Sequence, residues 1–220
     1  MSENETRPAA AELQPAPESP RRAPTRVLVE SAMLVAVAVA LSYLKISFLP
    51  YGGSITLCAL PIVLVSYRRG IKWGLLAGLA LSLVQMLNFR SAGFSALSVA
   101  VVVLFDYLLP FTALGLGGIF RGKFNKPGAE LALGSVVALA LRFLCHFISG
   151  YAVWGEYAEW FFSEMGEAGA GILANISGGA LAALYSLLYN ASYLVPEMII
   201  TALAALLLGK YALYGIEDAA

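Results

Sequence analysis

Long hydrophobic runs alternate with short polar segments along most of this chain. The apolar runs cover residues 27–44, 57–67, 71–89, 91–120, 131–153 and 189–208. A helix needs about 20 apolar residues to cross the hydrocarbon layer of a bilayer, and most of these runs approach that length. The runs are continuous, whereas a membrane β-barrel shows short segments of alternating polarity. The pattern predicts an all-α, polytopic membrane protein, a bundle of six transmembrane helices.

The second, fourth and sixth of these runs each contain a proline. Pro61 lies in the short second run, which predicts a short, broken or partly re-entrant helix. Pro110 lies in the long fourth run, which predicts a tilted or kinked helix. Residues 45–56 are predicted to form a loop, because they contain Pro50 and two adjacent glycines.

The last apolar stretch, residues 170–208, is too long for one helix that only crosses the bilayer. We therefore place the sixth span near residues 189–208, preceded by a re-entrant or interfacial stretch. Residues 1–25 are rich in Pro, Glu, Ala and Arg and lack the apolar core of a signal peptide. They are predicted to be a disordered cytoplasmic tail, followed by a membrane domain over 26–210 and a second cytoplasmic tail over 211–220.

Basic residues are distributed unequally between the two sides of the predicted bundle. One side carries Arg21, Arg22, Arg26, Arg68, Arg69, Lys72, Arg121, Lys123, Lys126 and Lys210, and the other only Lys45 and Arg90. Because Lys and Arg concentrate in cytoplasmic loops, both termini are predicted to be cytoplasmic.

The composition supports a membrane protein and excludes several other classes. Hydrophobic residues make up 60% of the chain and charged residues 13%, against roughly 45–50% and 25% in soluble domains. The net charge is zero, so nothing indicates nucleic-acid binding. No ATP-binding or dinucleotide-binding motif is found. Cys58 and Cys145 lack metal-site spacing and are interpreted as small core residues.

Several polar or aromatic side chains interrupt the apolar runs of the second half. They are Asp106, Tyr107, His146, Trp154, Tyr185 and Asn190. A charged group near the bilayer centre costs at least about 2.5 kcal/mol, so such residues are seldom kept for packing. Carboxylate and amide groups form hydrogen bonds, and aromatic rings stack on cations. The set therefore predicts a site for a small, flat, cationic ligand.

Alternative roles exist for most of these positions. Asp106 could be a structural ion-pair partner of Arg142 instead of facing a ligand, and His146 could be a satisfied core residue. Arg142, His146 and Gly150 share one helix face at spacings of four, and Gly150 would let a ligand approach the backbone. Trp154 could simply belong to the aromatic belt at the outer interface.

The last run contains a second polar stripe. Asn190, Tyr193 and Glu197 fall on one side of a helix, with Asn190 as a ligand-binding candidate. Glu197 follows a proline and is expected to satisfy neighbouring helix ends.

The first run carries a ridge of small residues at every fourth position. Ala32, Ala36 and Ala40 form it, with Ala38 beside it. Such ridges allow close helix contact. The ridge serves either packing within the protein or the docking of a partner helix.

Four segments resemble the thiamine-specific S components of energy-coupling factor (ECF) transporters. They are GGSITLCALPIVLVSYRRGIKWGLLAGL, DYLLPFTALGLGGIFRGK, RFLCHFISGYAVWGEYA and YSLLYNASYLVPE. The resemblance extends over nearly all of residues 26–208. It implies a six-helix S-component fold in a bacterial cell membrane and a thiamine-binding subunit without enzymatic activity. It also implies association with a transmembrane coupling subunit and two cytoplasmic ATPases.

The resemblance also assigns roles residue by residue. It places the acidic pyrimidine contact on Asp106, beside Tyr107, and the thiazolium between His146 and Trp154, with a contact at Gly150. Tyr185 and Asn190 would serve the aminopyrimidine, and Ala32 and Ala36 would dock on the coupling subunit. No cofactor or metal is implied, because thiamine is the transported ligand.

The sequence departs from the family pattern at four places. The family's glutamate is the shorter Asp106, a loop tryptophan is missing near Gly52, and a tyrosine is missing near Ala96, with Phe94 close by. Residues 159–184 form a longer stretch than is typical of the family.

Two other functions are weighed against the S component. One is a solitary ion-coupled transporter of thiamine or its pyrimidine precursor, with Asp106 or Glu197 as the protonated group. The other is an intramembrane enzyme using His146 and Asp106, which the absence of nucleophile and metal motifs disfavours.

Overall fold

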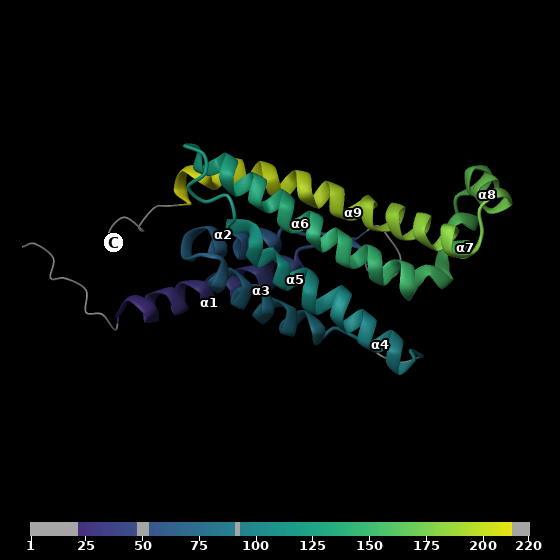
Figure 1. The fold of residues 1–220 in the computed structure, drawn as a ribbon, viewed down its shortest axis with the longest axis horizontal. Coiled ribbons are helices and arrows are strands. Elements are labelled where there is room, and N and C mark those ends of the chain that lie inside the picture. The colour runs from purple at the N-terminus through teal and green to yellow at the C-terminus, as the bar shows by residue number, and fades with distance from the viewer. Residues whose placement is uncertain (1–21, 48–52, 91–92, 213–220) are drawn as a thin grey trace, which may run out of the picture.

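The computed structural model describes residues 22–47, 53–90 and 93–212, and it is almost entirely helical (Figure 1). The long helices are α1 (Arg22–Tyr43), α3 (Ile71–Met86), α6 (Pro127–Ala152) and α9 (Gly178–Leu208), and the shorter ones are α2 (Ala59–Arg69), α4 (Ala96–Val102), α5 (Leu109–Ala113), α7 (Ala158–Ser163) and α8 (Gly166–Asn175). Short pieces of other helix types adjoin some of these helices: the π-helix η2 (Val103–Leu108) and the 3-10 helices η3 (Leu114–Gly118), η4 (Trp154–Tyr157) and η5 (Gly209–Tyr211).

Four stretches within the described residues are long and apolar enough to cross a membrane. They are Pro24–Tyr43, Ala96–Gly118, Pro127–Ala152 and Gly178–Leu208. The chain is therefore a multi-pass helical membrane protein. The second and third predicted spans correspond to α2 and α3, which have only 11 and 16 residues. Six full crossings consequently remain a prediction.

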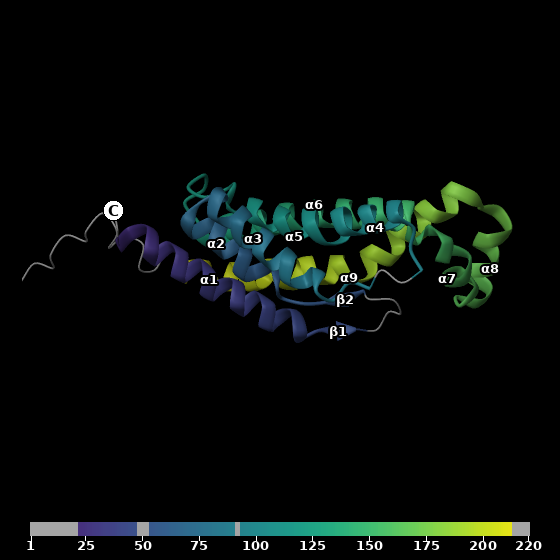
Figure 2. The ribbon, with the colours of Figure 1, turned by 90° about the horizontal axis from the view of Figure 1, so that it is seen from below.

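The last helix differs from the sequence-based expectation. α9 is a single helix of 31 residues that begins at Gly178, well before the predicted start near residue 189. At 1.5 Å per residue it is about 46 Å long, which exceeds a hydrocarbon layer of about 30 Å. The stretch before the predicted sixth span was expected to be re-entrant or interfacial. That stretch, residues 170–188, forms the second half of α8 and the first turns of α9, and its place in the membrane stays a prediction. α7 and α8 pack together at one end of the molecule (Figures 1 and 2).

The predicted loop over residues 45–56 contains a small hairpin. Strands β1 (Ile46–Ser47) and β2 (Ser54–Ile55) pair antiparallel, with Ile46 opposite Ile55. Gly52 lies outside the described residues, as does most of the two predicted tails. α1 already begins at Arg22, within the predicted N-terminal tail.

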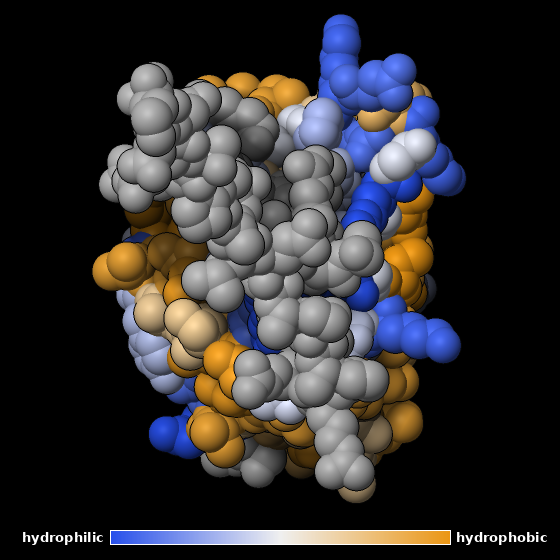
Figure 3. Space-filling model, turned by 90° about the vertical axis from the view of Figure 1, so that its left-hand side faces the viewer, coloured by the Kyte–Doolittle hydropathy of each residue, from blue (hydrophilic) through white to orange (hydrophobic). Residues whose placement is uncertain are grey.

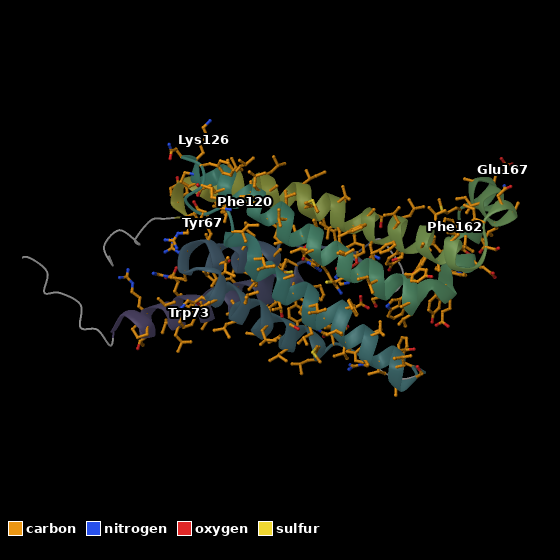
Figure 4. All side chains as sticks on the ribbon, viewed as in Figure 1. Tyr67, Trp73, Phe120, Lys126, Phe162 and Glu167 are labelled. Carbon is orange, nitrogen blue, oxygen red and sulfur yellow. The ribbon has the colours of Figure 1, made fainter. Side chains whose placement is uncertain are left out.

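Two apolar clusters hold the described residues together. The larger one joins α1, α2, α3, α6 and α9 around side chains such as Ile62, Leu81 and Leu139, none of which is exposed. Cys58 belongs to it, as predicted, while Cys145 is only partly buried. The smaller cluster joins α7 and α8 to the first turns of α9 around Phe162, which Figure 4 labels.

The two ends of the molecule carry opposite charge. Basic Lys126 lies at one end and acidic Glu167 at the other (Figure 4). At the basic end, Glu30 of α1 pairs with Arg68 and Arg69 of α2. Figure 3 looks at this end and shows hydrophilic side chains on it, with hydrophobic ones along the flanks. This separation of charge agrees with the asymmetry that the sequence predicted.

Candidate ligand-binding site

A cavity of about 510 Å³ lies between the helices. Its size falls within the range of roughly 300–1,000 Å³ that is typical of small-molecule sites. All seven predicted ligand-binding residues line it: Asp106, Tyr107, His146, Gly150, Trp154, Tyr185 and Asn190. They come from η2, α6, η4 and α9, so the cavity brings together side chains that are far apart in the sequence. Their contacts with a ligand remain a prediction.

Asp106 is presented by an irregular turn. It lies in η2, the π-helical segment that interrupts the fourth span. Pro110 follows four residues later and has no N–H to donate to the carbonyl of Asp106, so a regular α-helical bond cannot form there. Single π-turns within α-helices are frequent at functional sites. The predicted kink at Pro110 thus takes the form of a widened turn at the acidic residue.

The carboxylate of Asp106 accepts three hydrogen bonds. His146 Nδ1 lies 2.9 Å from Oδ1, while Ser149 Oγ and Trp154 Nε1 donate to Oδ2 at 2.7 and 3.0 Å. These contacts tie η2 to α6 and η4 and keep the carboxylate at the cavity wall. The indole N–H of Trp154 is thereby fixed, so this residue is more than a member of an interfacial aromatic belt.

Arg142 does not pair with Asp106, so the structural alternative weighed for Asp106 is wrong. The guanidinium of Arg142 instead donates to Glu197 Oε1 at 2.8 Å, and Glu197 is fully buried. Glu197 also accepts the backbone N–H and the hydroxyl of Thr56, each at 3.4 Å. Thr56 lies two residues before Cys58, the N-cap of α2, so Glu197 holds the segment that leads into α2 and is also an ion-pair partner. The prediction that it satisfies a helix end stays a prediction.

Gly150 permits close packing of α6 on α9. A Cβ at this position would overlap Ser186 Oγ and would lie 3.1 Å from Asn190 Nδ2. Helix packing therefore explains the glycine, and its predicted approach to a ligand stays a prediction. Arg142, His146 and Gly150 all line the cavity, so the shared face proposed from their spacing is confirmed.

α9 supplies a polar and aromatic wall. Asn190 donates to the backbone carbonyl of Ser186 at 2.8 Å and accepts from the hydroxyl of Tyr193 at 2.7 Å. Tyr185 is 4% exposed, and its ring lies 5.3 Å from that of Phe161 in α7. The smaller apolar cluster thus positions the part of the site that lies next to α7.

Sequence reasoning missed two parts of the wall. Tyr189 lies four residues after Tyr185 and lines the cavity, and its hydroxyl accepts the N–H of Gly53 at 3.2 Å. The i, i+4 spacing of the two tyrosines was a usable signal. The other part comes from polar residues at the ends of α1 and α3, among them Ser42 and Gln85, which no motif singled out.

Phe94 lies close to Ala96, where the family's tyrosine is missing, and its ring packs against Trp154 of the site. The ring of Phe94 lies 5.3 Å from Trp154 in an edge-to-face arrangement and 6.4 Å from Phe89. Ala96 itself is exposed at the start of α4. Phe94 therefore covers part of the Trp154 ring.

The alanine ridge lies away from the cavity. Ala32 and Ala36 are exposed on the surface of α1, next to Met33 and Val37, while Ala38 is fully buried against the bundle. The ridge therefore does not serve packing within the described part of the protein. It faces either lipid or another helix.

Comparisons with known proteins agree with this picture. The family model described as thiamine transporter protein (Thia_YuaJ) matches residues 28–164. The chain is 32% identical over 192 residues to thiamine transporter ThiT of Bacillus subtilis (strain 168), covering 82% of this chain and 88% of that protein. It is 26% identical over 164 residues to ThiT of Lacticaseibacillus paracasei, covering 68% and 81%.

Two solved structures share the fold. ThiT from Listeria monocytogenes superimposes with a TM-score of 0.65 at 20% identity, covering 86% of this chain and 96% of that one. The S component of a bacterial ECF transporter superimposes with a TM-score of 0.50 at 16% identity, covering 86% and 95%.

Proposed function

We propose, from the premise that the chain belongs to the thiamine transporter family, that it is the thiamine-binding membrane subunit, or S component, of an ECF-type vitamin importer. It is a transport protein and not an enzyme. The observation that carries the proposal is the convergence of seven residues, singled out from the sequence, on one cavity of suitable size.

The chemistry of the cavity suits thiamine. Thiamine joins a flat aminopyrimidine to a cationic thiazolium ring, so it needs aromatic surfaces, hydrogen-bond partners and a nearby negative charge. Trp154 and His146 provide rings for the thiazolium, and Asp106 lies between them as the anion. Tyr185 and Asn190 on α9 face the same cavity and are assigned to the aminopyrimidine. Tyr107 and Gly150 complete the proposed contact set.

Asp106 is well placed to respond to the ligand. Two of its three present partners, His146 and Trp154, line the cavity, so a donor group of the ligand can replace one of them without leaving the carboxylate unpaired. We expect the indole of Trp154 to be released from Asp106 when it stacks on the thiazolium.

The partner proposal rests on α1. Ala32 and Ala36 form a flat exposed strip on a helix that otherwise exposes large apolar side chains, such as Met33 at 65%. Small residues let helix backbones approach closely. We assign this strip to the coupling subunit of the transporter, which would act with two cytoplasmic ATPases.

Orientation follows from the charges. We assign the end of the bundle where α2 ends and α6 begins, and both termini, to the cytoplasm, because Lys and Arg gather at that end. The cavity then lies toward the outer half, because Trp154 and Tyr185 adjoin the acidic end that carries α7 and α8.

Identification of the bound ligand tests the proposal. The full chain is purified in detergent from cells grown without added vitamin, and the molecules that co-purify are identified by mass spectrometry. Thiamine at near-stoichiometric amount is the expected result. A pyrimidine precursor in its place would revise the ligand, and the absence of both, with no binding of added thiamine, would refute the proposal.

A transport measurement separates the S component from an ion-coupled carrier. The buried Glu197 is held by Arg142 and Thr56, an arrangement that suits a fixed anion better than a proton carrier. The purified chain in liposomes should therefore bind thiamine without accumulating it under an ion gradient. Accumulation without ATPase subunits would favour the solitary carrier.

A further inference from the structure

Buried and partly buried polar side chains form a continuous chain at the wall of the cavity. Glu197 accepts from Arg142 Nη1 at 2.8 Å, and Arg142 Nε donates toward His146 Nε2 at 3.3 Å. The other ring nitrogen of His146, Nδ1, lies 2.9 Å from Asp106 Oδ1. Arg142 thus stands directly behind a histidine that is proposed to contact the ligand.

The direction of these hydrogen bonds follows from the chemistry of arginine. A guanidinium has only N–H donors and no acceptor, so Nε2 of His146 must be the accepting nitrogen. A neutral imidazole carries one hydrogen, which is then on Nδ1 and is donated to Asp106. A doubly protonated ring would set an N–H of the histidine against the N–H of Arg142.

We propose that Arg142 is a positioning residue of the site, which fixes His146 as the neutral tautomer with its proton on Nδ1. This inference rests on the proposed binding of a cationic ligand in the cavity. A neutral His146 leaves the negative charge of Asp106 uncancelled, so that charge is available to the thiazolium. A buried cation here therefore supports the binding of another cation by controlling a tautomer.

The surroundings of Arg142 suit this task. Its own charge is matched by Glu197, and its guanidinium lies 4.8 Å from the ring centre of Phe111. His146 contacts Asp106 and Arg142, and its ring lies 6.5 Å from that of Tyr193. Lys45 and Arg90 also line the cavity but are exposed to solvent at its rim. Glu197 is thus paired with Arg142, whereas Asp106, with a neutral His146, is an anion without a paired cation.

Nuclear magnetic resonance on the ligand-free chain reads the tautomer directly. The sequence contains one histidine, so full-length protein with a histidine-free tag and ¹⁵N-labelled histidine gives the signals of His146 alone. The double variant Arg142→Met/Glu197→Gln removes both buried charges together, so neither is left unpaired. The control Glu30→Gln/Arg68→Met/Arg69→Met removes all members of an ion-pair cluster at the opposite end of the bundle.

We expect the Nδ1–H tautomer in the wild-type protein and in the control. In the Arg142→Met/Glu197→Gln variant we expect a mixture of forms and thiamine binding at least about tenfold weaker, because the site then spends part of its time with the wrong hydrogen-bond pattern. An Nε2–H or doubly protonated ring in the wild type would overturn the proposal. So would an unchanged tautomer or an unchanged affinity in the double variant. Failure of the wild type to bind thiamine would refute the proposed function, while the tautomer measurement would still decide the role of Arg142.

Discussion

α1 and α6 are both long apolar helices, yet α1 exposes its small residues on the surface while α6 buries its polar residues in the bundle. In the most apolar 18-residue segment of α1, 17% of the residues are buried in the bundle, and the small residues Ala32 and Ala36 are exposed. In α6 the corresponding share is 39%, and the polar residues Arg142 and Ser149 are buried. A small residue costs little on an exposed face, whereas a buried arginine requires partners. In the proposed function, coupling and ligand binding therefore reside on different helices.

The largest expected effect is a loss of transport without a loss of binding. Ala36→Trp, and likewise Ala32→Trp, should abolish thiamine uptake by cells, because a large side chain prevents close approach of a partner helix. The purified variants should bind thiamine as the wild type does, since both alanines lie away from the cavity. Radiolabelled uptake and equilibrium binding are measured on the same variants.

Leu207→Trp is the matched control for lipid exposure. Leu207 is 75% exposed on α9, so a tryptophan there changes the surface but not the proposed docking strip. Normal uptake by Leu207→Trp is expected. Normal uptake by Ala36→Trp as well would show that α1 simply faces lipid.

The next largest effect concerns the carboxylate. Asp106→Asn should weaken thiamine binding by about ten- to a hundredfold, because a hydrogen bond to a charged group contributes about 1.5–3 kcal/mol. Glu167→Gln, on α8 at the acidic end, is the control for loss of a negative charge and should bind normally. Isothermal titration of both purified variants gives the affinities, and equal affinities would show that Asp106 lies outside the site.

Trp154→Ala should lower the affinity about thirtyfold and should remove most of the fluorescence quenching by thiamine. A cation on a desolvated indole contributes about 2 kcal/mol. The chain has three tryptophans, and Trp160, which is 39% exposed on α7, provides the control. Quenching that disappears in Trp160→Ala but persists in Trp154→Ala would move the stacking site to α7.

Asn190→Ala should have the smallest effect, a loss of several-fold in affinity from one neutral hydrogen bond of about 1 kcal/mol. The side chain also bonds Ser186 and Tyr193, so the thermal stability of the variant is measured alongside binding. Asn175→Ala, at the exposed end of α8, removes a comparable amide and should change neither property.

Much of the site could be predicted because membrane burial makes polar residues conspicuous. Asp106, His146 and Asn190 are costly in apolar runs, and the resemblance to the S-component family assigned them to one ligand. The structure places all three at the same cavity.

The partner of Arg142 could not be predicted. Both Asp106 and Glu197 lie in apolar spans, and spacing along the chain does not decide which one meets an arginine on a different helix. The structure selects Glu197, because Asp106 is occupied by His146, Ser149 and Trp154. The position of Glu197 opposite Arg142 follows from the packing of α9 on α6.

The start of α9 was misjudged for a related reason. Its first turns lie before the expected span near residue 189. They are nevertheless apolar, because Leu181 and Tyr185 pack in one cluster with Phe162 of α7. Hydropathy does not distinguish a helix covered by lipid from one covered by a small helical cap. The hairpin before α2 was missed because each of its strands has only two residues.

In the proposed function, α6, η2 and α9 bind thiamine while α1 serves only transport. The most direct test is the thiamine dissociation constant of purified Asp106→Asn and Ala36→Trp, measured side by side with the wild type by tryptophan quenching. We expect binding at least about tenfold weaker for Asp106→Asn and within about twofold of wild type for Ala36→Trp. An unchanged constant for Asp106→Asn, or a comparable loss in Ala36→Trp, would contradict it.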